Sequence, residues 1–104
     1  METVLKYDEN KWRLSDVPQL ALRDVAKVFN YGANKYAKFN YSGNIQALRY
    51  YDACQRHLHA WMTGEDIDES GNPHLAHAIA SLMMLLDGLN NNLVQDDRNP
   101  AYKK

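Results

Sequence analysis

The sequence predicts an all-α protein with three main helices, at about residues 17–31, 45–62 and 74–90. In the first two segments apolar residues recur at helical spacing, and the third is apolar over most of its circumference. Residues that commonly start or end helices flank all three segments. The chain has 104 residues, which is room for one domain spanning residues 1–104.

Composition excludes several functional classes. The formal net charge of −1 provides no basic field for nucleic acid, so we expect no nucleic-acid partner. The longest apolar run, Leu82 to Leu86, is far shorter than the roughly 20 residues of a membrane span, and the N-terminus has no signal-peptide core. The single cysteine, Cys54, excludes an internal disulfide. We therefore expect a soluble cytosolic protein without a membrane partner.

The first helix follows an arm, residues 1–16, that shows no periodicity. Ser15 or Asp16, followed by Pro18, predicts the helix start, because a side-chain oxygen can cap free N–H groups and proline is tolerated in the first turn. Gly32 offers the left-handed position that commonly ends a helix.

An aromatic loop, residues 31–44, separates the first two helices and holds three tyrosines and two lysines. Lysine and asparagine donors beside stacking rings suit a base or a phosphate group, and Lys35 is the best phosphate candidate here. Asparagine and glycine are equally typical of loops that need positive φ angles, so both interpretations stay open.

The second helix is predicted to begin after a cap at Asn44 and to end at Gly64. One face is apolar: Ala47, Leu48, Tyr51, Cys54, Leu58, Trp61 and Met62. The opposite stripe is polar: Arg49, Asp52, Arg56 and His59. His57 lies at the edge of the apolar face, so it cannot form one chelate with His59, whose loss we expect to have no consequence.

The third helix is predicted to be capped by Ser70 or Asn72, with Pro73 in its first turn. Its apolar face is followed by further apolar residues around the helix: Leu75, Ile79, Leu82, Leu86 and Leu89, then Met83, Met84, Leu85 and several alanines. Such a helix must be buried nearly all round, which predicts a helical bundle completed by homo-oligomerisation, as a dimer or higher. The polar tail after Asn90 is expected to fray or to wrap a neighbour.

Histidines and carboxylates are concentrated in the acidic loop and in the ends of the two helices that it joins. His74 and His77 share a narrow stripe of the third helix, directly after the loop. Paired carboxylates in that loop, Glu65 with Asp68 or Asp66 with Glu69, would suit Mg²⁺ or Mn²⁺. Imidazole ligands tilt the choice toward Mn²⁺ or another first-row metal.

The same residues also permit a simpler interpretation. A solvated acidic loop would favour the N-terminus of the third helix through the helix dipole. The histidine spacing matches no hallmark metal motif, since H-L-A-H is not H-E-x-x-H. The residues by themselves thus leave the chemistry open.

Several motifs in order carry a resemblance to a known family. They are Gly32 to Tyr36 with Asn40, Arg56-His57, Gly64 to Gly71, and His74 to His77. Over roughly residues 6–88 the chain resembles the phage family of dATP/dGTP diphosphohydrolase N-terminal domains. The resemblance implies location in the cytoplasm of an infected bacterial host and hydrolysis of a purine deoxynucleoside triphosphate to the monophosphate and pyrophosphate.

That family is similar in setting to the all-α MazG-type enzymes, which implies Mg²⁺ or Mn²⁺ as the cofactor. MazG-type enzymes bind metal through E-x-x-E and E-x-x-D within helices. This sequence has no E-x-x-E, and its nearest E-x-x-D, Glu65 to Asp68, lies in a predicted loop.

The expected site follows from the acid–histidine cluster together with the resemblance. The expected catalytic residues are Glu65, Asp68 and His77. The expected metal ligands are Glu65, Asp68, His57, His74 and His77. The expected substrate-binding residues are Lys35, Tyr36, Asn40, Asp52, Arg56 and Lys11. The alternatives are a non-catalytic phage protein that binds or sequesters a nucleotide or nucleotide-derived signal, and a structural protein whose histidines are merely hydrogen-bonded.

Overall fold

A computed structural model describes residues 11–35 and 44–103 of the chain. Its elements, in order, are η1 (Leu14–Asp16), α2 (Gln19–Lys35), β1 (Ile45–Gln46), α3 (Ala47–Met62), α4 (His74–Asn90), β2 (Val94–Gln95) and η3 (Pro100–Tyr102). Three α-helices dominate these residues, and the two strands form only a short parallel pair. The all-α prediction is confirmed.

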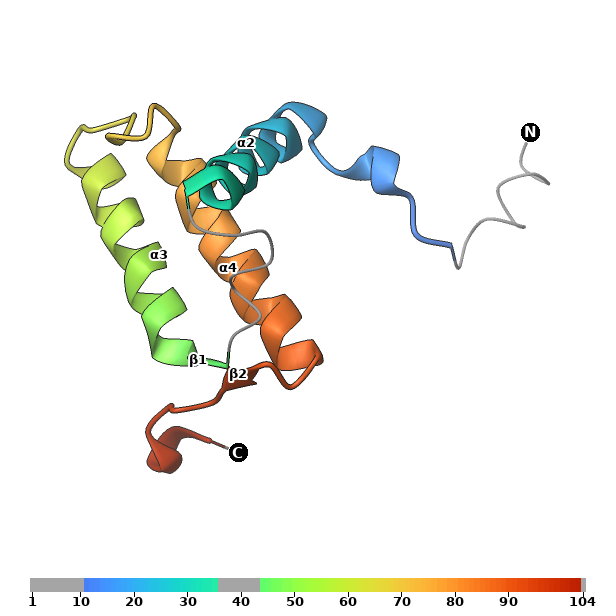
Figure 1. Ribbon diagram of the computed structural model, residues 1–104, viewed down its shortest axis with the longest axis vertical. Coiled ribbons are helices and arrows are strands. Elements are labelled where there is room, and N and C mark those ends of the chain that lie inside the picture. Colours follow the sequence, from blue (N-terminus) through green and yellow to red (C-terminus); the bar gives the residue numbers. More distant parts are fainter. Residues whose placement is uncertain (1–10, 36–43, 104) are drawn as a thin grey trace.

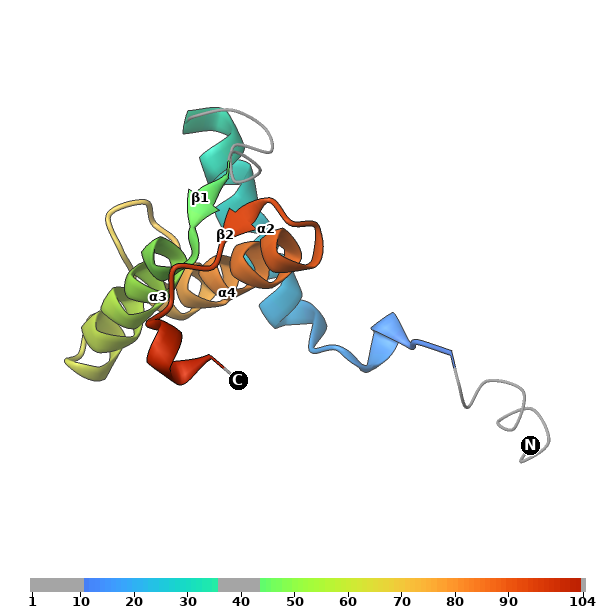
Figure 2. The ribbon, with the colours of Figure 1, turned by 90° about the horizontal axis from the view of Figure 1, so that it is seen from below.

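Helix α4 is the centre of the fold. Helix α3 runs antiparallel beside it, and α2 crosses it on another side (Figures 1 and 2). Val25 and Val28 of α2 pack on Ala76 and Ala80 of α4, with Phe29 at the margin of this cluster. Small side chains on α4 thus let α2 approach closely.

A second apolar cluster closes the end of the α3–α4 pair that lies farthest from the acidic loop. Ala47 and Tyr50 of α3 pack with Val94 of β2, against the half-buried Met84 and Leu85 of α4. The tail therefore folds back onto its own chain, and the expectation that it frays or wraps a neighbour is wrong.

Helix α3 receives its N-terminal cap from the tail. Asn44, the predicted cap, adopts a left-handed backbone with φ of 57°, and the residue at the cap position, Gln46, makes no side-chain cap. Instead, the Leu48 N–H donates to Asp97 Oδ1 at 2.9 Å. The register that brings Asp97 there is set by the parallel pairing of Ile45 with Val94.

The predicted caps of the other two helices are also wrong. Helix α4 spans the predicted residues, but Pro73 occupies its cap position with no side-chain cap, and Ser70 and Asn72 bond within the loop. Helix α2 begins at Gln19 because residues 14–16 form the separate turn η1, and the Gln19 side chain donates to the Leu14 and Val17 carbonyls.

Helix α2 also continues through Gly32 to Lys35, past its predicted end at residue 31. Glycine permits a left-handed helix end without requiring one, and the only positive-φ glycines in the described ranges are Gly64 and Gly71. Across residues 11–35 and 44–103, no helix combines the length and the apolarity that a bilayer crossing requires.

Candidate metal centre

The turn after α3 starts the loop that builds the site. Helix α3 ends at Met62, and the hydroxyl of Thr63 donates to the carbonyls of His59 and Ala60. Gly64 follows with φ of +102°, a conformation that side chains with a Cβ rarely adopt. The chain can therefore leave the helix at this point and begin the loop that leads to α4.

The loop is held by its own backbone. The Asp68 N–H donates to the Asn72 carbonyl at 3.0 Å, and the Gly71 N–H donates to the Asp68 carbonyl at 2.9 Å. The His74 N–H, at the start of α4, donates to the Asp66 carbonyl at 2.9 Å. These bonds fix the position of Asp68 beside the first turn of α4.

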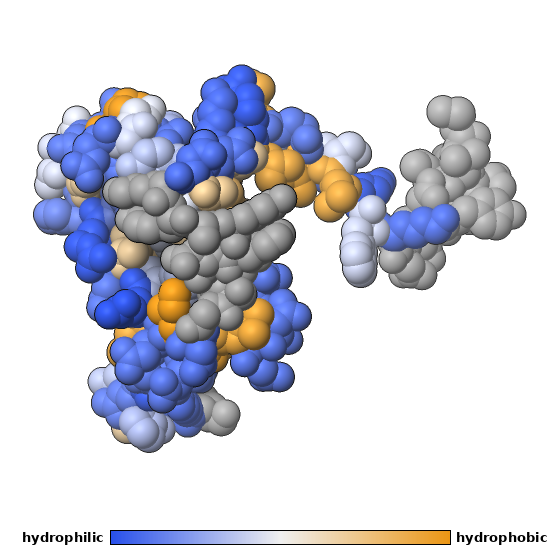
Figure 3. All heavy atoms as spheres, in the orientation of Figure 1, coloured by the Kyte–Doolittle hydropathy of each residue, from blue (hydrophilic) through white to orange (hydrophobic). Residues whose placement is uncertain are grey.

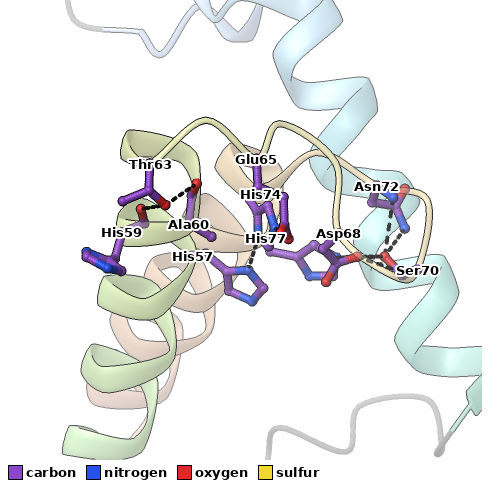
Figure 4. A network of polar contacts seen from close by, with 10 residues as sticks. All are labelled: His57, His59, Ala60, Thr63, Glu65, Asp68, Ser70, Asn72, His74 and His77. Carbon is purple, nitrogen blue, oxygen red and sulfur yellow. Dashed lines mark hydrogen bonds and ion pairs between the residues drawn. The ribbon is translucent and has the colours of Figure 1, made fainter.

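Three histidines meet this loop. His57 comes from α3, and His74 and His77, three residues apart, share one face of α4 (Figure 4). The His57 and His77 rings are stacked, with centroids 4.6 Å apart and planes 10° from parallel. The His57 and His74 rings are tilted at 46°, with centroids 5.1 Å apart.

His57, Asp68 and His77 form the candidate centre. Each offers a ligand atom, and the three atoms lie within 4.8 Å of one another. All three side chains are half-buried. Asp68 Oδ1 and His77 Nε2 lie 3.3 Å apart, which is close to the roughly 3.5 Å between neighbouring ligands of an ion bound at about 2.1 Å. Two imidazoles and one carboxylate are a set that first-row divalent metals accept, and they leave coordination positions open.

Asp68 and His77 are linked through Ser70. The Ser70 hydroxyl donates to Asp68 Oδ1, and the Ser70 N–H donates to the same oxygen at 2.7 Å. His77 Nε2 lies 2.9 Å from Ser70 Oγ and 3.3 Å from Asp68 Oδ1. Because the hydroxyl proton goes to Asp68, Ser70 Oγ accepts from His77 Nε2–H. Ser70 is thus part of the site, although its sequence position indicated only a helix cap.

Glu65 and His74 form a second arm of the network. Glu65 Oε1 lies 2.6 Å from His74 Nε2, and His74 Nδ1 lies 2.9 Å from His57 Nδ1. A carboxylate only accepts, so His74 Nε2 is the donor. With His74 neutral, its Nδ1 accepts the proton of His57 Nδ1, and the lone pair of His57 then resides on Nε2. That nitrogen is the one available to a metal.

The network shifts two pKa values. Burial lowers the pKa of His57 below its usual value, and electrostatic interactions with His77 and His74 lower it further, against the opposing interaction with Asp68. Burial alone would raise the pKa of Asp68, but the hydrogen bonds from Ser70 and the charges of His77 and His57 outweigh it, so that pKa is lowered. Both shifts favour the forms that bind cations, neutral imidazole and ionised carboxylate.

The metal-free groups also satisfy one another. Within the part of the chain that the structure describes, no buried side-chain nitrogen or oxygen lacks a hydrogen-bond partner. A cation must therefore displace existing bonds, such as the one between Ser70 and His77. Glu65 and His74 were both expected as metal ligands. In this structure they bond to each other, and His74 in turn bonds to His57, so they would act on the centre only by orienting His57.

Two of the expected substrate residues, Asp52 and Arg56, lie outside this network. Asp52 and Arg56 are exposed on α3, and the positive charge of Arg56 is near enough to lower the pKa of His57. Lys11 lies in the exposed arm, and Lys35 is the last residue of α2. Tyr36 and Asn40 lie outside the described residues. His59 is exposed and outside the histidine cluster, as expected.

Fold and site together define a small helical protein with a candidate histidine–aspartate metal centre where an acidic loop meets two antiparallel helices. The chain belongs to the family described as dATP/dGTP diphosphohydrolase, N-terminal, whose model matches residues 1–98. It is 36% identical over 97 residues to a protein of Salmonella phage PMBT28 named dATP/dGTP diphosphohydrolase. That match covers 92% of this chain and 33% of the relative, so the chain spans about a third of the relative's length. No solved structure gives a significant match.

Proposed function

We propose that His57, Asp68 and His77 bind a divalent first-row cation, with Mn²⁺ favoured over Mg²⁺. One observation carries the proposal: two helices and a loop bring two imidazoles and a carboxylate within 4.8 Å of one another. Mg²⁺ prefers oxygen ligands alone, whereas imidazole suits first-row transition metals. Glu65 and His74 would then act as positioning residues that hold the His57 lone pair toward the cation.

We further propose that the bound cation serves hydrolysis of a purine deoxynucleoside triphosphate. The relative's name, dATP/dGTP diphosphohydrolase, supports this substrate class. In the proposed reaction, water adds to the α-phosphorus, and the bond from that phosphorus to the oxygen bridging to the β-phosphorus breaks. The products are the monophosphate and pyrophosphate, with a proton released to solvent. A divalent cation supplies Lewis-acid activation and charge neutralisation for such a step.

The side chains of this chain would divide the remaining work. Arg56, exposed on α3 beside His57, is the proposed partner of the phosphate oxygens at the centre. Lys35 would contact the other phosphates, and Tyr36 would stack on the base. Asn40, Asp52 and Lys11 stay predictions for contacts to the base or sugar.

The test separates metal binding from hydrolysis. Mn²⁺ binding is measured by electron paramagnetic resonance on wild type, His77→Ala and Asp68→Asn, with His59→Ala as a matched control on the same helix pair. We expect wild type and His59→Ala to bind alike and the other two to bind at least about tenfold more weakly, since each loses one of three ligands. Equal binding by all four proteins would overturn the metal centre.

Hydrolysis is tested by incubating the Mn²⁺-loaded protein with a panel of deoxynucleoside triphosphates and separating the products by chromatography. We expect monophosphate and pyrophosphate from dATP or dGTP, with His77→Ala inactive and His59→Ala active. If the protein binds Mn²⁺ but forms no product from any of the triphosphates tested, catalysis by this chain alone is rejected.

A second candidate is nucleotide binding without chemistry. The observation favouring it is that the chain covers only 33% of the relative, so the named activity could reside in the other two thirds. The same cation would then hold a triphosphate that stays intact. Calorimetry with dATP and dGTP, followed by chromatography of the unchanged nucleotide, tests this. Loss of affinity in Lys35→Ala would locate the phosphates, and unchanged affinity would contradict that assignment.

A further inference from the structure

The large apolar residues of this fold face outward. Among residues 11–35 and 44–103, no leucine, isoleucine or methionine is buried. The buried apolar side chains are mostly small: Val25, Val28, Ala47, Tyr50, Cys54, Ala76, Ala78, Ala80 and Val94. Helices normally turn their largest apolar side chains toward a core. A single copy of this chain therefore leaves its main apolar surface in water.

Five exposed apolar residues of α4 form a continuous row, here called the α4 seam. The seam consists of Leu75, Ile79, Leu82, Leu86 and Leu89. Their exposure ranges from 39% to 64%, and their spacing alternates between four and three residues. That alternation is the a/d pattern by which two helices pack knobs into holes. None of the five positions carries a charge, so the seam has the composition of a helix–helix interface.

The accessible surface of the chain is larger than that of a self-contained protein of the same mass. The chain exposes 8411 Å², whereas a self-contained protein of 12.0 kDa exposes about 6,000 Å². The excess of about 2,400 Å² is larger than the roughly 800 Å² that each partner contributes to a standard interface. The exposed residues 11–20 account for part of it. Figure 3 shows hydrophobic surface around η1 and the start of α2 and near the C-terminal end of α4.

We propose that α4 pairs antiparallel with α4 of a second copy of this chain along the α4 seam. The seam is self-complementary, because a two-fold axis at Leu82 places Leu82 against its equivalent and Leu75 against Leu89, and brings Ile79 close to Leu86. Antiparallel pairing also opposes the two helix dipoles. The product is a bundle in which α3 and α4 of each copy surround a leucine-rich core that neither copy has alone.

The pairing leaves the candidate metal centre open. His74 and the half-buried His77 lie on the face of α4 that meets α3 and the acidic loop, whereas the seam faces outward. Dimer formation and metal binding are thus separable, and a monomeric variant should bind Mn²⁺ as wild type does. This inference stands whether or not the chain hydrolyses nucleotides.

Sedimentation equilibrium over a range of concentrations tests the pairing. We expect wild type to be a dimer at micromolar concentration. Leu82→Glu should weaken the dimer by about 100-fold or more, because it buries two like charges at the axis. Leu20→Glu makes the same change at an exposed leucine of α2 and should leave the dimer intact. Far-ultraviolet circular dichroism checks that both variants remain helical.

Cysteine crosslinking tests the direction without relying on a charged substitution. In a Cys54→Ala background, Leu82→Cys should form an intermolecular disulfide on oxidation, because the axis brings the two residues together. Leu75→Cys should not, since its partner is Leu89. Crosslinking through Leu75 alone would overturn the antiparallel arrangement. A wild-type monomer at every concentration would overturn the dimer and leave the seam to another occupant, such as the remaining part of the longer relative.

Discussion

The two ends of the α3–α4 pair are held by different interactions. At the loop end, Asp68, Ser70 and three histidines bond to one another in a half-buried polar network. At the other end, Tyr50 and Val94 pack in an apolar cluster, and β1 pairs with β2. Apolar packing stabilises the fold without a bound ligand and without a titratable group. The polar end holds the proposed metal ligands, so stability and ligand binding are expected to separate along the helices.

The largest effect is expected from Gly88→Ala, a substitution at the apolar end that should lower stability without changing metal binding. A Cβ at this position would lie 2.1 Å from Val94 Cγ2 and 3.1 Å from Val94 Cβ, so β2 must move away from α4. We expect the free energy of unfolding to fall by about 1–3 kcal/mol, as for other overpacked sites. Chemical denaturation measures the loss, and Mn²⁺ affinity should be unchanged. Val94→Ala removes the clashing methyl groups. In the double variant we therefore expect a smaller loss of unfolding free energy than the sum of the losses in the two single variants. Strictly additive losses would refute the contact.

At the polar end, Glu65→Ala should weaken metal binding and leave stability almost unchanged. It removes the acceptor that sets the His74 proton and, through it, the His57 lone pair. Partners of this kind typically contribute about 10- to 100-fold to metal affinity, and we expect Mn²⁺ binding to weaken within that range. Because the Glu65 side chain is largely exposed, the unfolding free energy should change little. Asp66→Ala, at a neighbouring exposed carboxylate, is the matched control, and equal affinities for the two variants would contradict the positioning role.

Asp97→Ala tests the far end more gently. It removes the acceptor for the Leu48 N–H in the first turn of α3, and loss of such a cap costs about 1 kcal/mol. Asp97→Asn keeps a side-chain oxygen and should retain most of that stability. Thermal unfolding of both variants measures the effect. A loss of Mn²⁺ affinity in Asp97→Ala would show that the two ends are coupled and would break the comparison.

Local patterns predicted the helices and part of the site geometry. The phase of α3 separated His57 from His59, and the spacing of His74 and His77 placed both on one face of α4. Periodicity contains no information about partners far apart in sequence. The Leu48–Asp97 cap joins residues 49 positions apart, and no signal in the tail indicated it.

The directions in which the side chains of the acidic loop point could also not be predicted from the sequence. Glu65 and Asp68 were expected as one carboxylate pair, yet they contact different histidines. The turn that separates them is closed by backbone bonds from Asp68 to Asn72 and from His74 to Asp66. Ser70 could have been recognised by its spacing, because serine two residues after aspartate commonly donates back to that carboxylate.

The smallest predicted effect is a pH dependence confined to the polar end of the metal-free protein. The pKa of His57 is lowered by burial and by its histidine neighbours, so below its usual value of 6.5 the unfolded chain takes up the proton more readily than the folded one. Stability is therefore complete above pH 6.5 and decreases as the pH falls through the lowered pKa of folded His57. Asp68 acts at lower pH, because its lowered pKa contributes stability above 3.8 that is lost as the pH falls through the folded value.

Melting temperatures measured across pH in the presence of a chelator separate the two pH ranges, the first due to His57 and the second, at lower pH, due to Asp68. His57→Gln cannot take up a proton, so the pH dependence should flatten in the first range, and Asp68→Asn should flatten it in the second. His59→Gln changes an exposed histidine outside the network and should reproduce the wild-type curve. If His57→Gln ran parallel to wild type down to pH 4, then acid sensitivity would arise elsewhere. His57 would then contribute nothing to the pH response.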